Sequence, residues 1–123
     1  MNPIAKTEVD KLIRTLDLKI DVSLPDDELK NMFIDSVDWI DISSEYQLSE
    51  YFMREFLNNL DKDLICEYQQ LSQNFMADFE EILNWKKISE FQTKTMTWKF
   101  MMRYKNQLQW VKMPRDKGYR GIY

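Results

Sequence analysis

The fold is decided by the stretch "VDWIDISSEYQLSEYFMREFLNN", residues 37–59, because the 23 residues that follow repeat it. Laid without a gap over "LDKDLICEYQQLSQNFMADFEEI", residues 60–82, it matches at eight positions. Chance would give about one or two. The matches are Asp38/Asp61, Ile42/Ile65, Gln47/Gln70, Leu48/Leu71, Ser49/Ser72, Phe52/Phe75, Met53/Met76 and Phe56/Phe79. A fixed period of this length indicates tandem structural repeats.

We name these stretches copy one (37–59) and copy two (60–82). Copy three, residues 83–107, restores the tryptophan of copy one, with Trp85 in the place of Trp39, and carries two extra residues within 93–97. In copy two this position is Lys62. Copy four begins with "LQWVKM" at Leu108 and is cut short by Pro114. The middle stretch is therefore a true repeat that has lost its tryptophan.

The apolar spacing inside each copy is helical. Phe52, Phe56 and Leu60 follow one another at i, i+4 and i+8, which is one face of an α-helix, and the later copies keep this spacing. Ser49 and Ser72 stand just before these runs, where a hydroxyl caps free backbone N–H groups, and Asp38 and Asp61 open the shorter segments that precede them. We therefore expect a short helix from residue 39 to about 46, followed by a longer one from 50 to 60. The aromatic stripe is predicted to be core.

The predicted fold class is all-α, with short tandem helix-pair repeats forming a mini-solenoid behind an N-terminal helical cap. Residues 26–113 contain neither glycine nor proline, which favours helices over turn-rich β folds. We expect a single domain over 1–123, divided into the cap (1–36), the repeats (37–113) and a basic tail (114–123). One copy cannot bury its own aromatic face, so neighbouring copies must stack.

Two helices are predicted in the cap. The first is expected to be capped at Thr7. The second is expected to follow Ser23, with Pro25 in its first turn, and its apolar face is predicted to be Leu29, Met32 and Phe33.

The composition argues against an enzyme. The chain has no histidine and one cysteine, Cys66, and it contains no glycine-rich phosphate loop. We expect no catalytic residue, no metal and no cofactor; the alternative that remains is a carboxylate-only site at a pair such as Asp61/Asp63 or Glu80/Glu81. Cys66 occupies the position of Ser43 and Ser89 and is interpreted as a packed small side chain.

The chain shows no signal peptide and no stretch near the roughly 18 apolar residues of a membrane span. A lone cysteine fits a reducing compartment. We therefore expect a soluble protein of the cytoplasm, without membrane contact. The oligomeric state is left open.

The charge is split between the two parts of the chain. Residues 1–83 carry a net charge of −12 and residues 84–123 carry +8. Such asymmetry points to macromolecular partners, with mutual attraction of the two ends as the alternative. The predicted acidic surface comprises Asp35, Asp38, Asp41, Glu45, Glu50, Glu55, Asp61, Asp63, Glu67, Asp78, Glu80 and Glu81. The predicted basic surface comprises Lys86, Lys87, Lys94, Lys99, Arg103, Lys105, Lys112, Arg115, Lys117 and Arg120.

Copy one resembles a short repeat found in proteins of bacteriophages, large DNA viruses and some bacteria. The resemblance rests on Asp38-Trp39, Ile42-Ser43, Gln47, Leu48-Ser49-Glu50 and Phe52 with Phe56, and weakens along 37–108. It assigns no activity. It implies a viral or mobile-element origin, with the host cytoplasm as location, and by analogy an inhibitor of host defence such as an anti-CRISPR protein.

Two functions follow. The first is a non-enzymatic inhibitor of a host nucleic-acid enzyme such as a CRISPR effector, whose carboxylates imitate phosphates. The alternative is a nucleic-acid-binding accessory protein that uses the basic C-terminal third. The predicted partner-binding residues are Lys112, Arg115, Lys117, Tyr119, Arg120, Glu80 and Glu81. The tail is expected to reach a partner, with a fold-back onto the acidic half as the alternative.

Overall fold

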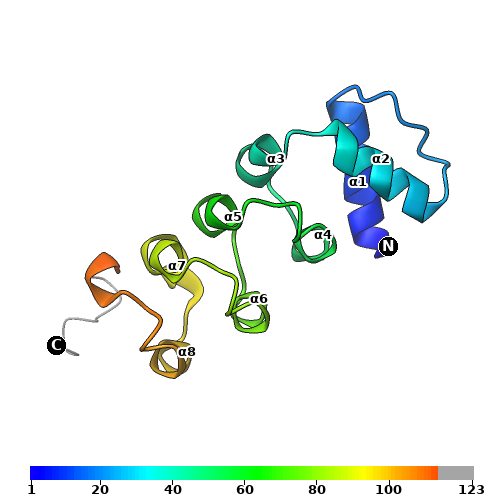
Figure 1. Ribbon diagram of the computed structural model, residues 1–123. Helices are drawn as coiled ribbons and strands as arrows, with labels where there is room; N and C mark the ends of the chain where they lie inside the picture. The colour runs from blue at the N-terminus through cyan, green and yellow to red at the C-terminus, as the bar shows by residue number, and fades with distance from the viewer. Residues whose placement is uncertain (114–123) are drawn as a thin grey trace. The chain divides into compact units, whose positions relative to one another are not determined.

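The computed structural model describes residues 1–113 and is all-helical in that part of the chain, where it contains no strand (Figure 1). The predicted fold class is thus confirmed at the level of all-α. The α-helices are α1 (Pro3–Thr15), α2 (Asp26–Ser36), α3 (Trp39–Glu45), α4 (Glu50–Glu55), α5 (Lys62–Tyr68), α6 (Gln73–Asp78), α7 (Trp85–Phe91) and α8 (Trp98–Arg103). Two 3-10 turns, η1 (Thr93–Thr95) and η2 (Trp110–Lys112), lie around α8.

The chain divides into two compact units, each with its own packing. Unit 1 is Met1–Asp61 and unit 2 begins at Lys62. Unit 1 therefore contains the cap, copy one and the first two residues of copy two, and unit 2 contains the rest of copy two, copy three and the start of copy four. A single domain over 1–123 stays a prediction.

The first helix of unit 1 begins earlier than the sequence suggested. α1 starts at Pro3, and the Asn2 side chain caps it by accepting hydrogen bonds from the N–H groups of Ile4 and Ala5. Thr7 lies inside the helix, where its hydroxyl donates to the Pro3 carbonyl at 3.0 Å. The prediction of a cap at Thr7 was wrong because asparagine followed by proline is itself a strong start signal.

The second helix differs from the prediction in how it begins and in one residue of its apolar face. Ser23 does not cap α2, since its N–H and hydroxyl both donate to the carboxylate of Asp21. Pro25 immediately precedes the helix. Leu29 and Phe33 are fully buried as predicted, but Met32 is exposed at 42%. Residues four apart share a helix face, and Met32 lies outside the narrow stripe that faces the core.

The core of unit 1 forms where the cap meets copy one. α1 packs against α4, and Glu8 of α1 accepts a hydrogen bond from the backbone N–H of Ser49. Phe33 of α2 contacts the rings of Trp39, Phe52 and Phe56, with centroids 5.9, 6.2 and 5.5 Å away. Each buried aromatic side chain contributes about 1.5–3 kcal/mol through burial.

The three copies share one local structure. The side chains of Ser49, Ser72 and Thr97 cap α4, α6 and α8 by accepting from the N–H three residues on, at 3.2, 3.1 and 3.1 Å. The prediction of caps at Ser49 and Ser72 is confirmed, and so is Asp38, whose carboxylate caps α3.

The second helix of each copy is shorter than predicted. α4 ends at Glu55, and Phe56 has left the helical region with φ −112° and ψ 22°. The chain continues to Leu60 in a turn that still buries both side chains. The prediction of a helix from 50 to 60 was wrong because this turn preserves the burial spacing of a helix.

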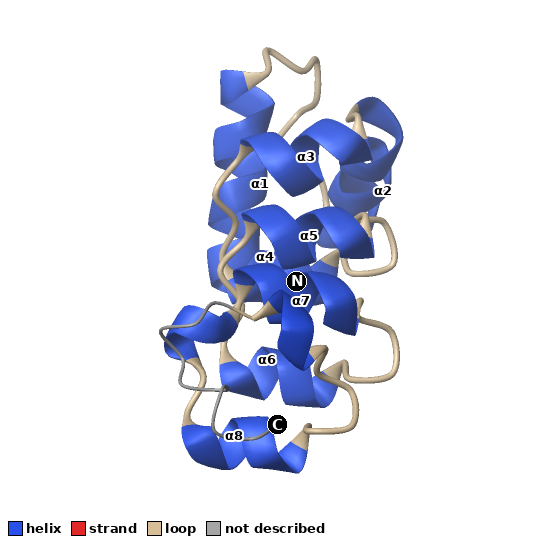
Figure 2. Cartoon of the chain, turned by 90° about the vertical axis from the view of Figure 1, so that its left-hand side faces the viewer, coloured by secondary structure: helices blue, strands red, loops and turns tan. Residues whose placement is uncertain are grey.

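In unit 2, copy three packs against copy two. α5 lies beside α7, α7 lies beside η2, and α6 and α8 follow one another on the other side of the unit (Figures 1 and 2). The buried side chain of Gln92 donates to the carbonyls of Cys66 and Gln69 and accepts from the N–H of Leu71. η1 occupies the place of the two extra residues.

Candidate functional site

The predicted partner-binding residues divide into three groups. Glu80 and Glu81 lie in the loop between α6 and α7, and Lys112 lies exposed in η2. Arg115, Lys117, Tyr119 and Arg120 fall outside the described residues. No hydrogen bond or ion pair within residues 1–113 joins Lys112 to either glutamate, so the structure does not bring these two groups together by direct contact.

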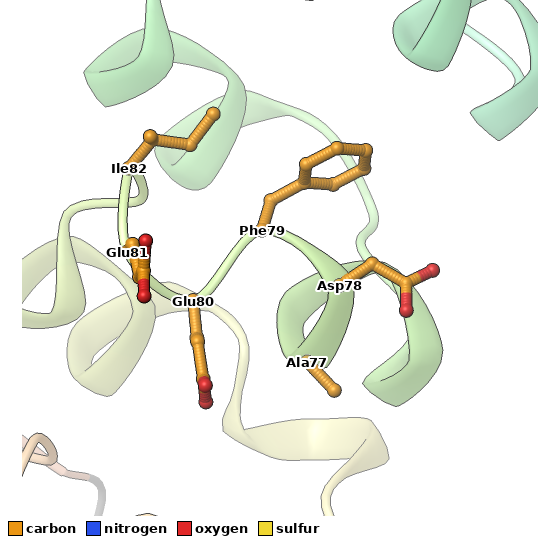
Figure 3. Close-up of a pocket in the computed structure, with 6 residues that line it drawn as sticks. All are labelled: Ala77, Asp78, Phe79, Glu80, Glu81 and Ile82. Carbon is orange, nitrogen blue, oxygen red and sulfur yellow. The ribbon is translucent and has the colours of Figure 1, made fainter.

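The loop of Glu80 and Glu81 borders an open depression of about 330 Å³, which is lined by residues 77–82 (Figure 3). Phe79 and Ile82 point to one side of the loop, and Glu80 points to the other. The Glu80 carbonyl accepts a hydrogen bond of 2.8 Å from the Trp85 indole, which ties this loop to α7. The site presents carboxylates on a fixed backbone, an arrangement that accepts hydrogen bonds from cationic groups.

A buried hydroxyl lies near this loop. Tyr104 is 2% exposed, and its hydroxyl has no partner at good hydrogen-bond geometry, although the Glu80 carboxylate lies close enough to interact with it. Burial raises the pKa of this hydroxyl above its ordinary value, and the nearby carboxylate of Glu80 acts in the same direction. Tyr104 therefore stays neutral at physiological pH.

The predicted acidic surface is distributed over both units, and some of its members are engaged. Glu55 pairs with Lys30 at 3.2 Å, and Glu67 pairs with Lys87 at 2.9 Å. The hydrogen bond between Glu67 and Lys87 lowers the pKa of Glu67 and raises that of Lys87. These carboxylates serve the fold as well as the surface.

A more concentrated acidic region lies in residues 26–45 of unit 1, and we call it the α2–α3 acidic surface. Seven carboxylates of this segment are exposed: Asp26, Asp27, Glu28, Asp35, Asp38, Asp41 and Glu45. The segment has one cation, Lys30, which is partly buried and held by Glu55. The last four of these carboxylates belong to the predicted acidic surface, whereas the first three were not predicted as part of it.

The predicted basic surface is largely exposed in unit 2. Residues 84–113 hold seven lysines and arginines and a single acidic residue, Glu90. Lys87 is engaged with Glu67, whereas Lys86, Lys94, Lys99, Arg103, Lys105 and Lys112 are all exposed. A strong positive potential is therefore expected on this part of unit 2.

Trp98 is a residue that the sequence analysis missed. It is 51% exposed at the start of α8, and its ring lies 6.5 Å from that of Trp110. The signal was present in the repeat register, because the equivalent positions in copies one and two are the polar residues Glu50 and Gln73.

Cys66 is fully buried, as predicted for a packed small side chain. The equivalent residues in copies one and three, Ser43 and Ser89, each form two hydrogen bonds to backbone groups. The Ser43 hydroxyl donates to the Trp39 carbonyl at 2.6 Å and accepts from the N–H of Asp61 at 2.9 Å. The Ser89 hydroxyl makes the same two bonds, to Trp85 and from Gln109. Each serine thus binds the first turn of its copy to the residue that opens the next.

In the described part of the chain, no three Asp, Glu or Cys side chains are grouped so that they could hold a metal ion. Over the same residues, every helix is too short or too polar to cross a bilayer. Comparison of the chain with protein-family models, with curated proteins and with solved structures gives no match.

Proposed function

We propose that this chain is a non-enzymatic binding protein of phage type that inhibits a nucleic-acid enzyme of the host, such as a CRISPR effector. The observation that carries the proposal is the α2–α3 acidic surface, with its seven exposed carboxylates and no exposed cation. The resemblance of copy one to the phage repeat supports the source. Enzymes that bind nucleic acid carry basic grooves, and a dense carboxylate face is complementary to them.

The spacing of these carboxylates supports binding over simple solvation. Asp41 and Glu45 lie four residues apart and share one face of α3, whereas Asp38 precedes the helix and caps it. Neighbours on such a face lie about 5–6 Å apart, and like charges there destabilise a helix by about 0.2–0.5 kcal/mol per pair. Clustering carboxylates on one helix face therefore lowers the stability of the helix, whereas the same charges scattered over the surface would not.

The proposed framework for this surface is a mini-solenoid of tandem helix-pair copies. The packing of α5 on α7 and the hydrogen bonds of Gln92 to copy two support it within unit 2. A test is to remove one whole period, residues 60–82. A modular array should keep its helical circular dichroism and a cooperative melt after this deletion, whereas removal of 60–71 alone should abolish cooperativity. Loss of cooperativity in both variants would refute the array.

Glu80 and Glu81 are proposed as a second contact with the same partner, and Lys112 as a flanking one. The fixed loop backbone supports this assignment, because a carboxylate on an ordered loop loses little freedom when it binds. For Arg115, Lys117, Tyr119 and Arg120 the contact remains a prediction from the sequence.

The proposal is tested by measuring target cleavage by a panel of purified, guide-loaded CRISPR nucleases with increasing amounts of the chain. At least one enzyme should be inhibited. The double variant Asp41→Asn/Glu45→Gln keeps the shape of α3 and removes two charges, so inhibition should weaken about tenfold or more, since hydrogen bonds to charged groups contribute about 1.5–3 kcal/mol each.

The matched control is Asp17→Asn/Asp21→Asn, which removes two exposed carboxylates of unit 1 outside the α2–α3 acidic surface. Its inhibition should equal that of the unmodified chain. Glu80→Lys/Glu81→Lys tests the second contact and should also weaken inhibition. Failure to inhibit any enzyme contradicts the proposed function, and inhibition that both acidic variants retain contradicts the carboxylate mechanism.

A further inference from the structure

Two neighbouring tryptophans, Trp98 and Trp110, lie in unit 2, on α8 and η2. Trp98 opens α8 directly after its cap, Thr97. The repeat needs no aromatic residue there, because copies one and two have Glu50 and Gln73, and the Trp98 side chain is half exposed rather than packed into the core. An exposed ring of this kind is informative here because a second indole, Trp110, lies 6.5 Å away and enlarges the aromatic surface.

Trp110 belongs to the truncated copy four. In copy one the indole lies 5.6 Å from the second aromatic ring, Phe56, and in copy three it lies 4.9 Å from Tyr104. The described chain ends at Met113, before copy four reaches a second helix, and the Trp110 ring contacts Trp98. Within residues 1–113, Trp110 thus keeps the position of a core residue but has no second helix of its own copy beside it.

The Trp110 ring is held in a fixed orientation. Its indole N–H donates to the Lys105 carbonyl at 3.0 Å, and Trp39 and Trp85 make the same bond five residues back, at 3.0 and 2.8 Å. Since the ring is already anchored, a ligand that stacks on it immobilises little further freedom.

The rings of Trp98 and Trp110 are inclined by 59° at a centroid distance of 6.5 Å. They do not form a parallel slot for one flat molecule. Trp98 is half exposed and Trp110 is partly exposed, so two neighbouring flat groups of one ligand match this arrangement better than a single one does.

The surrounding charge selects the ligand. Lys99 follows Trp98 on α8, and Lys105 and Lys112 flank Trp110; all three are exposed and none forms an ion pair within residues 1–113. Cations here repel a positively charged ligand such as a quaternary amine. They attract a polyanion, and the two indole faces require that it carry flat rings.

We propose that Trp98 and Trp110, with Lys99, Lys105 and Lys112, form a stacking site for single-stranded nucleic acid. Two bases stack on the indoles and the lysines contact the phosphates. A duplex is a poorer ligand because its base faces are already stacked on one another. This inference goes beyond the proposed function, since it gives unit 2 a ligand that the inhibitory contact does not need.

The test is fluorescence anisotropy with the full chain at low salt, using labelled oligothymidylate and oligouridylate of about 20 nucleotides and a DNA duplex of equal length. At least one of the two single strands should bind more tightly than the duplex. The single strand that binds more tightly shows whether the site prefers DNA or RNA. Trp98→Gln, which installs the residue of copy two, should weaken binding about 5- to 150-fold, as should Trp110→Ala. Lys99→Ala should reduce the slope of log affinity against log salt by about 0.7.

The matched control is Tyr51→Ala, which removes a half-exposed aromatic residue from α4 of copy one and should leave binding unchanged. Circular dichroism melts verify that each variant is folded. If Trp110→Ala does not fold, Trp98→Gln still removes one of the two rings from a folded chain. The inference is overturned if neither single strand binds, if Trp98→Gln binds as tightly as the unmodified chain, or if the duplex binds as tightly as the single strands. Equal competition by polyglutamate would also overturn it, since that result means charge attraction alone.

Discussion

Copies one and two have the same pattern but differ in what they bury. In copy one Trp39 lies 5.6 Å from Phe56, and Phe56 is completely buried. In copy two Lys62 stands in the place of the tryptophan, and Phe79 is only partly buried. Copy three, with Trp85 stacked on Tyr104, buries its second aromatic residue again. The spacing of the apolar residues is therefore the same in all three copies, but the second aromatic residue is more deeply buried in the two copies that have the tryptophan.

The largest expected effect comes from truncating the second aromatic residue in the two copies. Phe56→Ala should cost about 3–5 kcal/mol in the free energy of unfolding, since it opens a cavity in the core of unit 1. Phe79→Ala, whose sequence pattern alone predicts the same loss, should cost about 1–2 kcal/mol because its ring is partly in water. Urea unfolding of both variants measures the difference, and equal losses would contradict the comparison.

The next effect concerns the buried serine. Ser43→Ala removes the acceptor of the Asp61 N–H and should cost about 1–3 kcal/mol, the penalty for an unsatisfied buried donor. Ser43→Cys installs the residue of copy two and should cost less, because Cys66 is accommodated at the same position. Thermal melts of the two variants provide the measurement. A cysteine variant as unstable as the alanine variant would show that the thiol is no substitute.

A gain is expected from giving copy two its missing tryptophan. Lys62→Trp should stabilise the chain by about 0.5–1.5 kcal/mol through an aromatic pair with Phe79, as between Trp39 and Phe56. The melting temperature should rise, and the rise should vanish in a Phe79→Ala background. A gain that persists in that background would assign the effect to something other than the ring pair.

The smallest effect is expected from Tyr104→Phe, which gives copy three the aromatic residue of the other copies. Stability at neutral pH should stay constant or rise by up to about 1 kcal/mol, because the hydroxyl is buried without a hydrogen bond of good geometry.

The pH dependence sharpens this test. The raised pKa of Tyr104 means that above about pH 10 the unfolded chain releases this proton before the folded chain does. The unmodified chain should therefore lose stability faster than the variant in alkaline solution. Parallel pH profiles of the two proteins would contradict the burial of this hydroxyl.

The sequence predicted those features that depend on neighbouring residues. Ser49 and Ser72 were identified as caps because a hydroxyl directly precedes the aromatic run. The end of α4 was not predictable from apolar spacing, because the turn from Phe56 to Leu60 buries the same residues that a helix would bury. Local capping chemistry can be read from sequence, whereas a turn that imitates helical burial cannot.

For the candidate sites the limit was tertiary contact. The sequence placed Glu55 and Glu67 on the predicted acidic surface, but their lysine partners are 25 and 20 residues away and emerged only from the fold. Trp98 differed in kind, since comparison of the three copies position by position would have shown a tryptophan where the others have polar residues. Comparing the copies position by position is enough to find a residue such as Trp98. Ion pairs between residues distant in sequence can be found only in the structure.

The serine bridges have a consequence for how this chain can change in length. The bond from Asp61 to Ser43 spans 18 residues and that from Gln109 to Ser89 spans 20, yet both keep nearly the same geometry. The additional length is taken up in η1, where Lys94 and Thr95 are exposed. This point is a natural entry for inserted sequence, so an epitope tag or a fluorescent reporter placed between Lys94 and Thr95 should leave the fold intact.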